Sequence, residues 1–122
     1  MNDCACLYGG YDGYDESDFQ CNRMRRARKE HVCGECRETI QKGQMYEVYS
    51  SKHDGSVSST KTCAVCTEIR MALYCDGFYF GRMWSDIREQ LFPHFTLACV
   101  EKLSTTAAKE TLTKRYREFL GV

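Results

Sequence analysis

Two pairs of closely spaced cysteines are the residues of this sequence best suited to chemistry. Each pair has two residues between its cysteines, and 26 residues separate the pairs, which are Cys33-Gly34-Glu35-Cys36 and Cys63-Ala64-Val65-Cys66. Two intervening residues let both sulfurs of a tight turn reach one ion, and two such pairs supply the four thiolates of a tetrahedral zinc site. The spacing therefore predicts one structural zinc ion bound by Cys33, Cys36, Cys63 and Cys66.

The same four cysteines have less specific interpretations: buried or oxidised residues without a metal, a rubredoxin-type iron site, or redox-active pairs. The segments around them lack the strand–helix–strand pattern of a thioredoxin domain. A zinc ion held by four protein thiolates has no open position for a water molecule, so it cannot act as a hydrolytic catalyst. We therefore interpret the site as structural zinc and the chain as non-enzymatic.

The elements that position these cysteines follow from the residues between the pairs. Residues 45–49 and 57–62 are typical of two strands, and His53-Asp54-Gly55 of the tight turn that joins them. Apolar residues at helical spacing predict a helix that begins near Cys63 to Cys66. A cysteine turn, a hairpin and a helix that begins at the second pair follow one another as in a treble clef. We predict an α+β fold with a treble-clef-like zinc core.

Apolar residues beyond this core recur at the spacing of helices. Residues 80–91 and 108–120 each carry such a stripe, with Pro93 after the first and Gly121 at the end of the second. We expect a single compact unit with three parts. These are an N-terminal arm with a basic segment (1–26), the zinc core (27–76) and a helical C-terminal part packed on the core (77–122).

Five cysteines lie outside the two pairs. Nine is an odd count, and residues 1–19 hold five acidic residues and no basic one, unlike a secretory signal. We therefore expect metal ligands and free thiols rather than disulfides. Cys4-Ala5-Cys6 is a half-site for a second zinc ion, and its other ligands would come from Cys21, His31, Cys75, His94 or Cys99. Spacing does not choose among them, so we predict at least one zinc ion and leave the second open.

The net charge and its distribution along the sequence bear on whether the partner is a nucleic acid or a protein. The chain has 17 Lys and Arg against 17 Asp and Glu, and this neutral total argues against a nucleic-acid coat protein. Five basic residues nevertheless fall within seven positions: Arg23, Arg25, Arg26, Arg28 and Lys29. They could bind nucleic acid or an acidic protein surface, or form a solvated face. The acidic residues before them should weaken duplex DNA binding at physiological salt, so we favour a protein partner.

Two other classes are disfavoured. The longest uncharged apolar run, residues 91–100, is too short to cross a membrane, and no small-molecule site is evident. An HNH-type nuclease would keep a catalytic histidine on the hairpin, where His53 lies beside Asp54. The following helix offers no histidine or asparagine for the second catalytic position, which argues against this activity.

The stretch Ala27-Arg28-Lys29-Glu30-His31-Val32-Cys33-Gly34-Glu35-Cys36 resembles part of a family of small proteins common in tailed-phage and prophage genomes. The resemblance continues through Ile40, Gly43, Tyr46, Asp54-Gly55, Thr62-Cys63, Cys66 and Gly77-Phe78-Tyr79-Phe80-Gly81, and spans residues 4–84. Those relatives typically begin with a C-x-C motif, matched here by Cys4 and Cys6. The resemblance implies a phage-type zinc-binding protein in the cytoplasm of a bacterial host, and no particular activity. Phage accessory proteins of this size often bind a host protein or a defence complex, which is the partner we expect.

Overall fold

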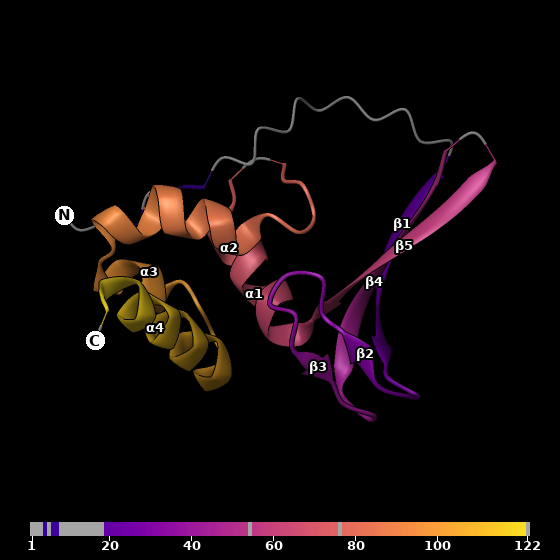
Figure 1. Cartoon of the computed structure of the whole chain (residues 1–122), viewed down its shortest axis with the longest axis horizontal. Coiled ribbons are helices and arrows are strands. Elements are labelled where there is room, and N and C mark those ends of the chain that lie inside the picture. The colour runs from indigo at the N-terminus through magenta and orange to yellow at the C-terminus, as the bar shows by residue number, and fades with distance from the viewer. Residues whose placement is uncertain (1–3, 5, 8–18, 54, 76, 122) are drawn as a thin grey trace.

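Strands precede helices along the chain. The computed structural model describes residues 4, 6–7, 19–53, 55–75 and 77–121, and its fold is α+β, as predicted (Figure 1). The strands are β1 (Phe19–Arg26), β2 (His31–Val32), β3 (Thr39–Ile40), β4 (Met45–His53) and β5 (Ser56–Cys63). The helices are α1 (Ala64–Leu73), α2 (Met83–Asp86), the π-helical turn η1 (Ile87–Leu91), the 3₁₀ turn η2 (Phe92–His94), α3 (Leu97–Glu101) and α4 (Thr106–Leu120).

An antiparallel sheet with the strand order β1-β4-β5 projects away from the helices (Figure 1). The β4–β5 hairpin is longer than the sequence predicts, and Gly55 in its turn has φ +83°, which suits glycine. The basic end of the expected N-terminal arm is not separate from the core, because it forms the edge strand β1. In the register, Arg25 pairs with Tyr46, which in turn pairs with Cys63. A second, two-stranded sheet pairs β2 with β3.

Helix α1 packs against one face of the larger sheet. Its Arg70 is buried and donates from Nη2 to both carboxylate oxygens of Glu47 on β4, at 2.6 Å each. The guanidinium lies over the rings of Phe78 and Phe80, 4.5 and 5.3 Å from their centroids. Thr62 on β5 is also buried on this face. Helix and sheet are therefore joined by a buried charge pair as well as by apolar contact.

The expected helix over residues 80–91 is broken. It begins only at Met83, because Gly81 has φ +86°, outside the helical region. It then widens into η1 and ends in η2, where Pro93 occupies the first turn. The apolar stripe still faces inward along this segment, since Met83, Ile87 and Leu91 are buried.

Helix α4 agrees closely with its prediction. Thr105 is the N-cap, and its hydroxyl accepts a hydrogen bond from the Ala108 N–H at 3.2 Å. Gly121 ends the helix with φ +80°. The carboxylate of Glu68 on α1 accepts from the N–H groups of Ser104 and Thr105 at 2.6 and 3.0 Å, so it attaches the start of α4 to α1.

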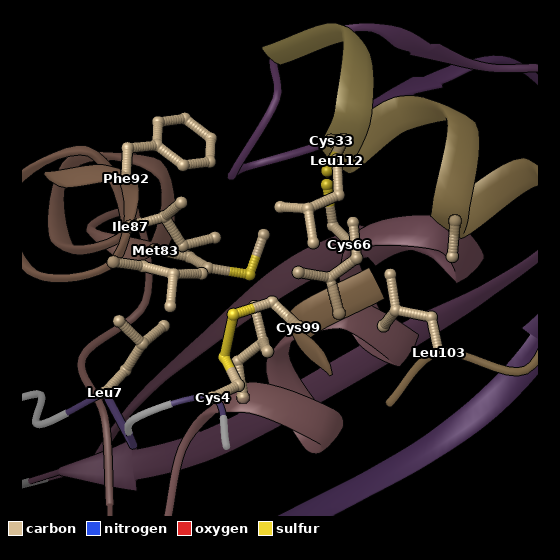
Figure 2. Close-up of a cluster of buried hydrophobic side chains, with 14 of the residues drawn as sticks. Cys4, Leu7, Cys33, Cys66, Met83, Ile87, Phe92, Cys99, Leu103 and Leu112 are labelled. Atoms are coloured by element: carbon tan, nitrogen blue, oxygen red, sulfur yellow. A yellow bond between two sulfur atoms is a disulfide. The ribbon is translucent and has the colours of Figure 1, made fainter. Parts of the chain in front are cut away.

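The main core lies among the helices. Figure 2 shows side chains from α2, η1, η2, α3 and α4 meeting those of Cys4 and Leu7. Those buried here include Leu7, Met83, Ile87, Phe92, Cys99, Leu103 and Leu112. Each large apolar side chain buried in such a core contributes about 1.5–3 kcal/mol. No helix within the described ranges is both long and apolar enough to span a bilayer.

Candidate metal centre

The four cysteines of the two C-x-x-C pairs meet at one point. The sulfur atoms of Cys33, Cys36, Cys63 and Cys66 all lie within 4.8 Å of one another, and the Sγ atoms of Cys36 and Cys63 are 3.9 Å apart. Thiolates bound tetrahedrally at about 2.3 Å to one ion would be separated by about 3.8 Å. The cluster can therefore hold a metal ion with little rearrangement.

The first pair lies in the turn between β2 and β3. The Cys33 N–H donates to the Glu38 carbonyl at 2.9 Å, and Arg37 completes the turn with φ +66°. The Gly34 N–H donates to the Lys61 carbonyl on β5 at 2.8 Å. A Cβ at position 34 would lie 3.3 Å from that oxygen, which makes glycine the best fit for this close approach.

The second pair lies at the start of α1. Cys63 is the N-cap residue, and its Sγ accepts from the Cys66 N–H at 3.4 Å. The Sγ of Cys33 accepts from the N–H groups of Cys63 and Glu35, at 3.3 and 3.4 Å. Backbone donors and the positive end of a helix both stabilise thiolate charge.

The proximity of the four thiols separates their pKa values. Hydrogen bonds from Cys36, Cys63 and Cys66 lower the pKa of Cys33. Hydrogen bonding with Cys33 raises the pKa of Cys36, but Cys63 and Cys66 outweigh it and lower that pKa to about 7. The pKa values of Cys63 and Cys66 are raised, first by Cys33 and Cys36. Four thiolates would repel one another here without a cation, so metal binding must release protons.

The centre is enclosed on most sides. Cys33 and Cys66 are buried, whereas Cys36 and Cys63 are partly exposed. The exposed side opens onto a shallow hollow of about 370 Å³ whose lining includes Cys36, Cys63 and Thr111 of α4. All four ligand positions come from the protein, which is the arrangement of a structural site.

The expectation of free thiols is wrong for four of the remaining cysteines. The structure joins Cys4 to Cys99 and Cys6 to Cys75 as disulfides, with Cα–Cα distances of 4.9 and 5.5 Å. The N-terminal segment reaches these partners because the Leu7 N–H donates to the Leu73 carbonyl at the end of α1, at 3.0 Å.

The other candidates for a second zinc site are not brought to Cys4 and Cys6. His31 contacts the ring of Tyr46 at 4.9 Å between centroids, and His94 is exposed at the end of η2. Cys21 belongs to β1, but its side chain lies outside the described residues, as do the side chain of His53 and all of Asp54. Within the described part of the chain, the group suited to a metal is the four-cysteine cluster.

The five basic residues separate at the end of β1. Arg23, Arg25 and Arg26 belong to β1, whereas Arg28 and Lys29 lie in the turn to β2. Arg26 donates to the Gly43 carbonyl at 2.8 Å. Desolvation and then the charges of Lys61, Lys29 and Arg25 lower the pKa of His31, so Lys61 on β5 belongs to the same charged region. Sequence reasoning missed Lys61, because only the pairing of strands brings it there.

A second residue that sequence reasoning missed is Glu35, inside the first cysteine pair. Its buried carboxylate accepts from the N–H groups of Gly81 and Met83, at 2.9 and 3.1 Å. Glu35 thereby fixes the start of α2 to the cysteine turn. The only sequence signal for Glu35 is its position between Cys33 and Cys36. That position fits a solvent-exposed side chain as well as one that is bonded to the start of α2.

Comparisons with protein families, with curated proteins and with solved structures give no match to this chain.

Proposed function

We propose that the chain is a non-enzymatic binding protein whose fold is held by one structural zinc ion in a treble-clef-type core. The observation that carries this proposal is the meeting of four cysteine sulfurs within 4.8 Å. Their backbone N–H donors and the completeness of the ligand set support a closed site. A closed site supplies folding energy and offers no open position for catalysis.

Zinc is the metal that this donor set favours, since doubled C-x-x-C pairs around a hairpin are typical of structural zinc. Cys33, Cys36, Cys63 and Cys66 would hold the ion and attach the β2–β3 turn to the start of α1. Rubredoxin-type iron is the rival with the same ligands. An HNH-type nuclease is less well supported. Helix α1 carries no histidine or asparagine for the second catalytic position.

The partner we propose is a macromolecule of the bacterial host, met in its cytoplasm by a phage-type accessory protein. We favour a host protein or defence complex, and the exposed apolar end of α4 supports this choice. There Phe119 and Leu120 remain 39% and 53% exposed. A nucleic acid is the second candidate, favoured by the basic residues on the sheet.

The metal is tested by elemental analysis of purified, reduced protein. We expect one tightly bound zinc ion per chain at the four-cysteine cluster, and loss of the folded state in Cys33→Ser. A structural zinc site contributes on the order of 10 kcal/mol, comparable to the whole stability of a small domain. Cys21→Ser is the matched control, because it removes a thiol outside the cluster and should keep the zinc.

Two results would contradict this proposal. One is a protein that folds without any bound metal, together with a folded Cys33→Ser variant. The other is stoichiometric iron with its visible absorption, which would replace zinc by the rubredoxin-type site. The class of partner is tested by capture from host lysate with and without nuclease, since a nucleic-acid partner disappears after nuclease treatment.

A further inference from the structure

The face of the larger sheet opposite α1 carries cations from all three strands. In the register, Arg23 on β1 pairs with Val48 on β4, and Val48 pairs with Lys61 on β5. Residues paired directly across strands, and residues two apart along one strand, share a face. Arg25 and Lys52 therefore belong to the same face as Arg23 and Lys61. We call these four residues the basic face: Arg23, Arg25, Lys52 and Lys61.

Among the residues that the structure describes, no carboxylate forms an ion pair with the basic face. Within the described ranges, the one ion pair closer than 4 Å joins Arg70 to Glu47, and Glu47 belongs to the face that α1 covers. The strand positions that share the basic face include no Asp or Glu. Ser50 and Ser59, which pair across the hairpin, place hydroxyl groups between the cations. Hydroxyl groups can donate to phosphate oxygens as well.

The positive surface continues beyond the end of β1. A shallow hollow of about 540 Å³ is lined there by Arg25, Arg26, Ala27, Arg28, Lys42 and Gly43. Arg25 belongs to both regions and so joins the hollow to the basic face. None of the described residues that line the hollow is acidic.

The neutral total of the chain conceals an uneven distribution of charge along the sequence. All 17 Lys and Arg residues lie in residues 19–122. Five of the 17 Asp and Glu residues come before them: Asp3, Asp12, Asp15, Glu16 and Asp18. Residues 19–122 therefore carry an excess of positive charge, and the basic face is where strand pairing gathers four of these cations.

We propose that the basic face binds the phosphate backbone of duplex nucleic acid, without reading its sequence. This inference rests on the proposed binding function and takes up its second candidate partner, a nucleic acid. A repeating row of phosphates matches cations spaced along and across neighbouring strands. Single strands fit less well, because they need exposed rings for stacking, and Tyr46, the aromatic residue of this face whose side chain the structure describes, is 4% exposed. A protein partner would need central apolar or aromatic anchors, whereas Val48 at the centre packs against the core and the exposed Val57 lies at the far end of the hairpin.

The test is a salt titration of binding to a labelled DNA duplex, followed by fluorescence anisotropy. Four phosphate contacts predict a slope of log K against log salt of about −3.6, which means an affinity loss of about 150-fold between roughly 50 and 200 mM salt. Arg23→Ala/Lys61→Ala should weaken duplex binding at low salt. It should also reduce the affinity loss over the same salt range to about 12-fold. Arg88→Ala/Lys114→Ala is the matched control, since it removes two exposed cations from the helical part, and should retain the parental slope.

Zinc content and circular dichroism of each variant separate this inference from the proposed function. Folded, zinc-loaded protein that binds no duplex at low salt would overturn the inference and leave the zinc-held binding protein intact. Equal losses in the two double variants would also overturn it, because the position of the charges would then not matter. Tighter binding to polyglutamate than to the duplex would assign the basic face to an acidic protein. Protein without zinc would contradict the proposed function itself.

Discussion

Arg70 illustrates how one residue can couple elements that no local pattern connects. Its guanidinium is 2% exposed, is paired with Glu47, and stacks on two aromatic rings. Among the described residues, its Nε and Nη1 atoms have no hydrogen-bond partner. The Glu47 carboxylate and the two rings therefore provide its polar compensation.

Removal of the carboxylate should be costly for this reason. We expect Glu47→Gln to lower the free energy of unfolding by about 3–5 kcal/mol, because it leaves a buried guanidinium without its counter-charge. Urea denaturation monitored by circular dichroism measures the change. The double variant Glu47→Leu/Arg70→Met removes both charges and should recover most of the loss. A double variant no more stable than Glu47→Gln would show that the pair contributes mainly through its shape.

Among the elements, two disulfides attach Cys4 and Cys6 to the helical part of the chain. The cysteines of the two bonds differ in their exposure to solvent. Cys75 is exposed and Cys6 is partly exposed, whereas Cys4 and Cys99 are 7% and 0% exposed. A reductant reaches an exposed sulfur first. We expect mild reduction to open Cys6–Cys75 before Cys4–Cys99, as measured by alkylation and peptide mass spectrometry.

Simultaneous opening of both disulfides would contradict this order. In Cys6→Ser/Cys75→Ser, the Cys4–Cys99 link should remain closed under the same mild reduction. Disulfides are rare in a reducing cytoplasm, so the state of these cysteines in cells also tests the proposed location.

The elements with strong local signals were predictable, and those formed by long-range pairing were not. The clustering of four cysteines, the hairpin and α4 follow from spacing, turn residues and caps. Strand β1 was not predicted, because residues 22–26 are mostly charged and show no apolar alternation. Its pairing with β4 decides its structure. The disulfides were not predicted for a similar reason: their pairing is long-range, since the bonded cysteines are 95 and 69 residues apart. The broken helix at 83–94 shows Gly81 and Pro93 overriding an apolar stripe of helical period.

At the scale of the molecule, charge is separated along the chain. Residues 12–18 contain Asp12, Asp15, Glu16 and Asp18, and Asp18 directly precedes Phe19, the first residue of β1. Fixed charges influence one another within about 8 Å at physiological ionic strength, and over longer distances in dilute salt. These four carboxylates are therefore tied by the chain to the strand that supplies Arg23 and Arg25.

This connection predicts a gain of affinity when the four acids are neutralised. We expect Asp12→Asn/Asp15→Asn/Glu16→Gln/Asp18→Asn to strengthen duplex binding several-fold at low salt, and the gain to shrink as salt screens the charges. The matched control changes four exposed acids of the helical part: Glu89→Gln/Glu101→Gln/Glu110→Gln/Glu118→Gln. It alters the net charge equally but should strengthen binding less, because those residues are not adjacent to β1. An equal gain in both variants would mean that total charge governs binding. No gain in the first would mean that the acidic segment does not oppose the basic face.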